Sequence, residues 1–133
     1  MRENLFHGKR KDNGEWVEGY YVPVGEYHYI LTGKLVLASY LVSYLGFEHF
    51  LVIPETVGQY AELPDKNGKK IFEGDIVRDA ETSEVGKIFF DKYTAMFVIG
   101  FENTIADFNA SYNLEVIGNI YDNPELIGEK TND

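Results

Sequence analysis

Acidic side chains are densest between residues 73 and 81, and they are the first group in this chain that could do chemistry. Glu73, Asp75, Asp79 and Glu81 fall in this short stretch, and carboxylate oxygens are the ligands that Mg²⁺ prefers. If they converge, they could hold a metal that activates water, as in a metal-dependent hydrolase. The alternative, which we favour because such spacings are common, is that they flank a surface strand with Arg78 as a partner.

The histidines and the other catalytic signatures give weaker signals. His7, His28 and His49 lie 21 residues apart, so no pair has the short spacing of a helical zinc motif. We expect them beside aromatic rings or at strand edges. The chain has no cysteine, no Gly-x-Ser-x-Gly elbow and no glycine-rich phosphate loop. The sequence therefore predicts no catalytic residue and no cofactor, and it leans against an enzyme.

Basic residues cluster at two expected turns. The clusters are Lys9, Arg10 and Lys11, and Lys66, Lys69 and Lys70. If both turns lie on one rim, they could grip phosphates, with Tyr20, Tyr21 or Tyr60 stacking on bases. We favour the alternative that the lysines solubilise hairpin ends. The formal net charge is −10, and the acidic residues 102–133 would repel phosphates, although they leave DNA mimicry open.

The elements that must position these residues are predicted to be mainly β-strands. Aromatic residues make up 15% of the chain, and they suit pleated, half-buried surfaces. Asn13-Gly14 and Asn67-Gly68 predict tight type I′ hairpin turns, since both residues tolerate positive φ. Strands are expected at residues 5–10, 15–22, 27–31, 47–53, 57–61, 76–78, 85–90, 95–101 and 115–121. Many short strands at close intervals indicate a barrel or sandwich.

The connections between these strands are less regular. Residues 32–34 are predicted to form a turn, residues 38–45 fit a helix or a strand, and residues 91–94 are expected to close a hairpin. Residues 104–112 could form a loop or one helical turn. Asn123 is expected to cap a short helix at residues 124–127. Gly74 and Asp75 predict a bend, and Gly118 predicts a bulge.

Two long motifs resemble a known family. The first runs from Val57-Gly58-Gln59-Tyr60 through Asp65-Lys66-Asn67-Gly68-Lys69-Lys70-Ile71-Phe72-Glu73-Gly74-Asp75-Ile76-Val77. The second is Glu115-Val116-Ile117-Gly118-Asn119-Ile120-Tyr121-Asp122-Asn123-Pro124-Glu125-Leu126. Together with Phe6-His7-Gly8-Lys9-Arg10, they resemble the YopX family of bacteriophage and prophage proteins. The resemblance implies a phage or prophage origin and a mostly β fold with a small, SH3-like barrel in the C-terminal half, and it supplies no activity. The residues themselves predict an N-terminal β-hairpin region and little helix.

Size and composition complete the expectations. The 133 residues suit one domain, which we place at residues 1–127 with subdomains 1–56 and 57–127 and a polar tail at 128–133. The absence of cysteine and of a signal-peptide pattern predicts a cytoplasmic protein. The apolar region 35–53 is too interrupted to span a membrane. The leading hypothesis is a non-enzymatic module that binds a host or phage protein, with homo-oligomers as a further expectation.

Overall fold

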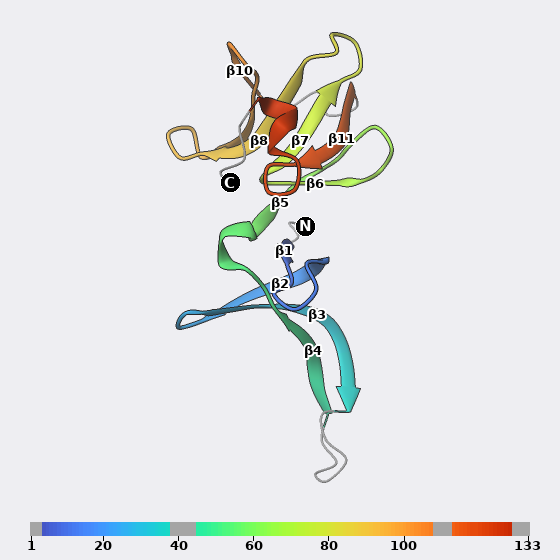
Figure 1. Ribbon diagram of the computed structural model, residues 1–133, viewed down its shortest axis with the longest axis vertical. Helices are drawn as coiled ribbons and strands as arrows, with labels where there is room; N and C mark the ends of the chain where they lie inside the picture. Colours follow the sequence, from blue (N-terminus) through green and yellow to red (C-terminus); the bar gives the residue numbers. More distant parts are fainter. Residues whose placement is uncertain (1–3, 38–44, 108–112, 129–133) are drawn as a thin grey trace. The chain divides into compact units, whose positions relative to one another are not determined.

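The computed structural model describes residues 4–37, 45–107 and 113–128, and these residues form two antiparallel sheets (Figure 1). The strand order is β4-β3-β2-β1-β5-β6 in the first sheet and β10-β9-β8-β7-β11 in the second. The strands are β1 (Phe6–Lys9), β2 (Trp16–Val24), β3 (Tyr27–Leu37), β4 (Leu45–Leu51), β5 (Gly58–Pro64), β6 (Lys70–Phe72), β7 (Asp75–Asp79), β8 (Val85–Asp91), β9 (Met96–Gly100), β10 (Ile105–Asp107) and β11 (Leu114–Asn119). The helical segments among the described residues are the short 3₁₀ turns η1 (Pro54–Thr56) and η3 (Pro124–Ile127). The prediction of a mainly β protein is therefore confirmed.

The chain divides into two compact units, Met1–Gln59 and Tyr60–Asp133, and the boundary lies within β5. The first unit contains β1 to β4, η1 and the start of β5. The second contains the rest of β5 and the strands that follow it. No helix among the described residues is both long and apolar enough to cross a membrane.

The first unit begins with the expected hairpin of β1 and β2. Its four-residue loop is closed by a hydrogen bond from the Arg10 N–H to the Glu15 carbonyl at 2.8 Å. Gly14 has a φ of +74°, and it is the only residue of this loop with a positive φ. A type I′ turn needs positive φ at both central residues, so the hairpin is confirmed but the turn type was wrong.

Strand β3 passes straight through the segment predicted as a turn. Gly33 has a φ of +87°, and the register with β4 jumps from the pair Leu31–His49 to the pair Leu35–Phe47. The glycine therefore relieves a bulge, and the predicted turn at residues 32–34 is wrong. Figure 1 shows β3 and β4 as a long hairpin. Most of the segment predicted ambiguously, residues 38–44, lies outside the described residues.

One face of the first unit's sheet is well packed. Ile30 of β3 and Val52 after β4 are fully buried there. Two glycines let the backbones approach: a Cβ on Gly19 would lie 2.0 Å from the Leu31 carbonyl oxygen, and one on Gly8 would lie 3.1 Å from Val52 Cβ. Phe6 and Tyr21 pack on the same face with ring centroids 5.3 Å apart.

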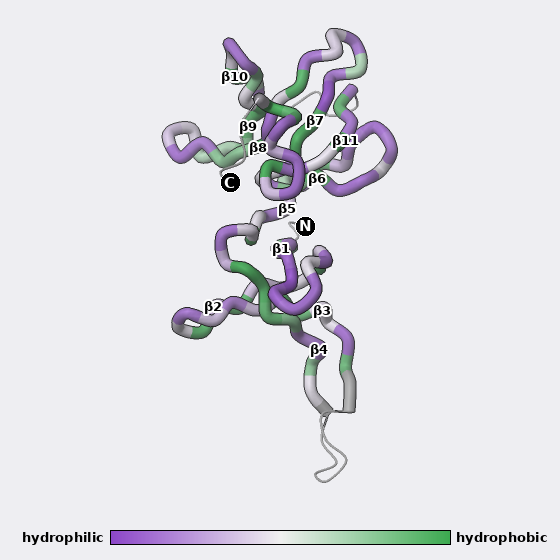
Figure 2. The backbone as a smooth tube through the Cα atoms, in the orientation of Figure 1, coloured by the Kyte–Doolittle hydropathy of each residue, from purple (hydrophilic) through white to green (hydrophobic). Residues whose placement is uncertain are grey.

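The second unit has its own core, and Figure 2 shows hydrophobic stretches along β7 and β8. The buried cluster consists of Ala61, Ile71, Val77, Ile88, Ile99 and Leu114. The pairings of the described strands leave β10 and β11 as sheet edges, so they close no barrel, against the expectation of an SH3-like barrel. A turn occupies the outer edge of β11 instead, because Lys66 donates its N–H to the Leu114 carbonyl at 2.8 Å.

The β5–β6 connection confirms a turn at Asn67-Gly68 but not its type. Asp65 and Gly68 bracket the turn through a Gly68 N–H to Asp65 carbonyl bond of 3.0 Å. Gly68 has a φ of +83° and Asn67 has no positive φ. This is the geometry of a type I turn followed by a left-handed glycine.

Of the remaining local predictions, two are confirmed and two are wrong. The hairpin at residues 91–94 joins β8 and β9 as expected, and the register of β11 jumps at Gly118, which confirms the bulge. Part of the segment 104–112 is neither loop nor helix but strand β10, and residues 108–112 lie outside the described residues. Asn123 does not cap η3, since its Oδ1 accepts the Asn119 N–H at 3.3 Å.

Candidate functional site

The carboxylates at residues 73, 75 and 79 lie on or beside β7, and hydrogen bonds to the backbone engage two of them. Gly74, with a φ of +93°, forms the expected bend, and Asp75 Oδ2 accepts the Phe72 N–H at 2.8 Å. Asp79 Oδ1 accepts the N–H groups of Glu81 at 2.8 Å and Thr82 at 3.3 Å. Glu73 is half-buried in the bend. Among the described residues, no three His, Asp or Glu side chains are arranged to hold a metal ion.

The partner of Arg78 lies outside this group. Its guanidinium donates to Glu115 Oε2 on β11 at 3.1 Å, so the expected pairing with a carboxylate of the 73–81 group is wrong. The register of the sheet explains this contact, because Arg78 and Glu115 are directly opposite each other on β7 and β11. Cross-strand pairs of opposite charge are a common form of sheet stabilisation.

Asp75 is the most perturbed titratable group among the described residues. Asp75 is only 5% exposed. Burial raises the pKa of its carboxyl to about 7, and the nearby charge of Asp65 adds to the rise. The Phe72 N–H and Lys69 oppose this rise. A buried carboxyl that titrates near neutral pH is a feature of many functional sites, but structural networks show it too.

Asp65 is a second buried carboxylate, which the sequence analysis did not single out. Its Oδ1 accepts the N–H groups of Asn67 at 2.8 Å and Lys69 at 2.9 Å, and its Oδ2 accepts the Val116 N–H at 3.0 Å. These bonds lower the pKa of the Asp65 carboxyl although burial opposes them. The detectable signal was an aspartate at the first position of an Asx turn. Its role is to fasten this turn to β11.

The two basic clusters belong to different units. In the first, Arg10 donates two hydrogen bonds to Asp12, at 2.9 and 2.6 Å, and its guanidinium lies 4.1 Å from the centre of the Phe50 ring. These contacts with Asp12 raise the pKa of Arg10 and offset its charge. The second cluster, Lys66, Lys69 and Lys70, is exposed on the β5–β6 turn.

Of the three tyrosines named for base stacking, two are packed against other rings and one is exposed. Tyr21 packs on Phe6 with centroids 5.3 Å apart, and Tyr60 packs on Phe72 with centroids 5.7 Å apart. Tyr20 is exposed on the opposite face of its sheet from Tyr21. Of the three, Tyr20 alone therefore presents most of its ring to a ligand.

The three histidines sit beside aromatic rings, as expected. His7 lies against Trp16 with ring centroids 4.5 Å apart, and His49 meets Tyr29 edge-on at 5.7 Å. His28 Nδ1 is hydrogen-bonded to the Tyr21 hydroxyl. Nδ1 of His49 donates to the Phe47 carbonyl oxygen at 2.9 Å. Each imidazole is therefore held by local contacts within the first unit.

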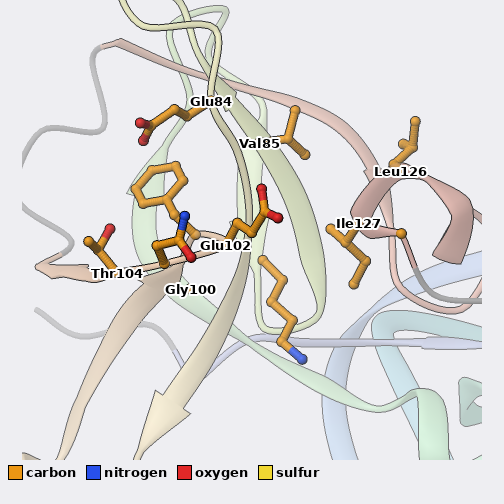
Figure 3. A pocket seen from close by; sticks show the side chains of 11 residues that line it. Glu84, Val85, Gly100, Glu102, Thr104, Leu126 and Ile127 are labelled. Atoms are coloured by element: carbon orange, nitrogen blue, oxygen red, sulfur yellow. The ribbon is translucent and has the colours of Figure 1, made fainter.

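A polar groove of about 720 Å³ lies in the second unit. Figure 3 shows Leu126 and Ile127 of η3 on one side and Glu84 and Thr104 on the other, with Glu102 between them. The remaining lining residues are Val85, Lys87, Gly100, Phe101, Asn103 and Gly128. Its two carboxylates and single lysine side chain offer hydrogen bonds and charge, but the lining holds no histidine to act as a base near neutral pH.

The largest exposed hydrophobic feature of the first unit is one face of β2, β3 and β4. Residues that pair across these strands point to the same side, so the register defines a single surface. This surface, called the apolar face below, consists of Tyr20, Val22, Val24, Tyr27, Tyr29, Leu31, Leu35, Phe47, His49 and Leu51.

The ten residues of the apolar face are open to solvent and carry no fixed charge, and the exposed Glu18 of β2 lies at their edge on the same side of the sheet. The most exposed members of the face, Tyr20, Val24, Tyr27, Leu35 and Phe47, are each 51–59% exposed. None of its ten side chains is a carboxylate, an ammonium or a guanidinium. The largest apolar patch on a protein surface is often functional. The detectable signal was alternation, since Tyr20, Val22 and Val24 and then Tyr27, Tyr29 and Leu31 recur at every second position.

Fold and sites together define a mainly β protein of two small antiparallel units, with an open apolar sheet face in one and a polar groove in the other. The chain belongs to the YopX family, because the family model described as YopX protein matches residues 6–128. The fold is also similar to the crystal structure of protein EF1440 from Enterococcus faecalis, at 22% sequence identity and a TM-score of 0.64. That match covers 96% of this chain and 99% of the other. No curated protein matches the chain.

Proposed function

We propose that this chain is a non-enzymatic protein-interaction module, encoded by a phage or prophage and active in the cytoplasm of the host cell. The observation that carries the proposal is the apolar face, on which five large hydrophobic side chains from three strands are more than half exposed. Aromatic side chains such as Tyr20 and Phe47 are enriched where proteins bind proteins. Family membership supports the phage origin through the resemblance noted above.

The carboxylates support a structural role over a catalytic one. Asp65 holds three backbone N–H groups and Asp75 holds one, so both serve the β5–β6 region in the folded state. Asp79 closes its own turn. A substitution at these positions is therefore expected to change the stability of the second unit rather than to remove a reaction.

The test is a pull-down from host lysate with and without nuclease, read by mass spectrometry. The wild-type chain is compared with Phe47→Ser on the apolar face and with Tyr93→Ser, which alters an aromatic residue that is 89% exposed in the β8–β9 turn. We expect a protein retained after nuclease treatment to be lost with Phe47→Ser and kept with Tyr93→Ser. Equal retention by all three chains would refute the proposal.

The second candidate is nucleic-acid binding through the β5–β6 turn. It is favoured by three exposed lysines, Lys66, Lys69 and Lys70, on a turn that the Asp65 carboxylate fixes. A gel shift at low and moderate salt tests it, because phosphate contacts are strongest at low salt. No shift at low salt would remove this candidate, and a shift abolished by replacing the three lysines with Ser would support it.

A further inference from the structure

We propose that a second copy of this chain occupies the apolar face, so that two copies pack sheet against sheet about a two-fold axis. This inference rests on the proposed function and names the partner of the same surface. In an isologous contact the same face is used on both copies. Three properties of the apolar face support this partner: its area, its charge and the regularity of its strands.

The exposed apolar area is more than half of what each partner of a standard dimer buries. A large aromatic side chain offers about 150 to 250 Å², so the five members that are more than half exposed contribute on the order of 500 Å² of accessible surface. The partly exposed Val22, Tyr29 and Leu31, with His49 and Leu51 beside them, extend this area. A standard interface buries about 800 Å² on each partner. The five exposed members therefore supply more than half of that area, and the partly exposed members add to it.

The charge distribution permits a contact between identical chains. The chain carries a formal net charge of −10, so most approaches of two copies bring like charges together. Like charges placed opposite each other across an interface disfavour binding. The ten residues of the apolar face carry no fixed charge, and two copies can meet there without this penalty where the contact leaves the edge residue Glu18 in solvent. These ten residues also lack the charges by which a strongly basic or acidic partner would be selected.

The strands supply a regular surface for the contact. Five consecutive residue pairs join β2 to β3, from Tyr20–Leu31 to Val24–Tyr27. Their side chains alternate between the two sides of the sheet, so the part of the apolar face before the bulge at Gly33 is formed by parallel rows of Tyr, Val and Leu. Two such sheets pack about 10 Å apart with their strands about 30° from parallel, and their inner side chains interdigitate. The buried Ile30 on the opposite side holds β3 in place.

The test combines sedimentation velocity of the full chain with charge variants. Phe47→Glu and Phe47→Lys each place a charge on the apolar face, and Tyr93→Glu is the matched control in the other unit. We expect a wild-type dimer that each Phe47 variant weakens by at least about 30-fold, since a buried unpaired charge is costly. The control should dimerise as the wild type does. Circular dichroism checks that each variant is folded.

The outcomes separate this inference from the proposed function. A wild-type chain that is monomeric at about 100 μM, far above the Kd of standard-size complexes, would overturn the inference. A dimer that the Phe47 charges do not weaken would overturn it too. If the wild type is monomeric but Phe47→Ser still loses a captured protein, the proposed function stands with another partner. If Phe47 substitutions change neither assembly nor capture, both fail.

Discussion

The buried carboxyl of Asp75 makes a sharp prediction about stability and pH. Its pKa is raised from 3.8 to about 7 in the folded chain, first by burial. We propose to replace it by asparagine, which has nearly the same shape, carries no charge and keeps an oxygen that can accept the Phe72 N–H. The substitution therefore removes the titration while leaving the bend at Gly74 in place.

The sign follows from proton linkage. Between pH 3.8 and about 7 the folded state holds a proton on Asp75 that the unfolded state has lost, so the free energy of unfolding falls as pH rises. The contribution of the Asp75 proton to the free energy of unfolding is fully present below the pKa of Asp75 in the unfolded chain. It is lost as pH rises through the higher pKa of the folded chain. A shift of one pKa unit corresponds to about 1.4 kcal/mol. Between pH 5 and pH 8 the wild type should therefore lose about 2.5 kcal/mol that Asp75→Asn keeps.

The assay is urea unfolding of both chains at pH 5 and pH 8, followed by circular dichroism, because the single tryptophan, Trp16, lies in the first unit and Asp75 in the second. The quantity compared is the difference in free energy of unfolding between the two chains, which cancels titrations that they share. Asp12→Asn is a control: Arg10 lowers the pKa of the Asp12 carboxyl, so its titration ends below pH 5 and its difference from wild type should stay constant. A difference for Asp75→Asn that is constant or shrinks as pH rises would refute the reasoning.

Three further predictions follow from local contacts. Gly19→Ala should destabilise the first unit by more than about 2 kcal/mol in thermal or urea unfolding, because its Cβ would lie 2.0 Å from the Leu31 carbonyl oxygen. Gly25→Ala, whose Cβ meets nothing within 4 Å, should cost only about 1 kcal/mol through its positive φ; equal losses would contradict this account. Asp65→Ala should cost about 3 kcal/mol or more, since three N–H groups lose their acceptor, and unchanged stability would contradict it. Calorimetry with Mg²⁺ or Mn²⁺ should give no saturable heat, and a saturable signal lost on replacing the carboxylates at 73–79 would revive the hydrolase hypothesis.

The parts of the fold that the sequence predicts are those set by a few adjacent residues. The hairpins at residues 11–14 and 91–94, the bend at Gly74 and the bulge at Gly118 all depend on local backbone preferences. The turn at residues 32–34 was wrong because Gly33 fits a turn and a bulge equally well. Only the pairing of Leu35 with Phe47 distinguishes them, and that pairing is a property of two strands together.

The candidate sites depended on burial, which spacing does not reveal. Asp75 was correctly assigned to a bend, but its raised pKa depends on how fully the surrounding chain covers it. Asp65 was overlooked because its third partner, Val116, is 51 residues away. Arg78 was given a neighbour in sequence, whereas the register of β7 with β11 gives it Glu115. For Asp65 and Arg78 the deciding contact is distant in the chain.

The apolar face is exposed because the described part of the first unit has a single layer of secondary structure. A stable domain normally packs two layers of secondary structure around a core. Here β1 to β4 belong to one sheet, and its packed side holds the fully buried Ile30 and Val52. The described residues of this unit supply no second layer for the other side, where Tyr20 and Phe47 are more than half exposed. Because the same alternation that buries one side must present the other, the sheet leaves an apolar side open, and we propose a protein partner as its covering.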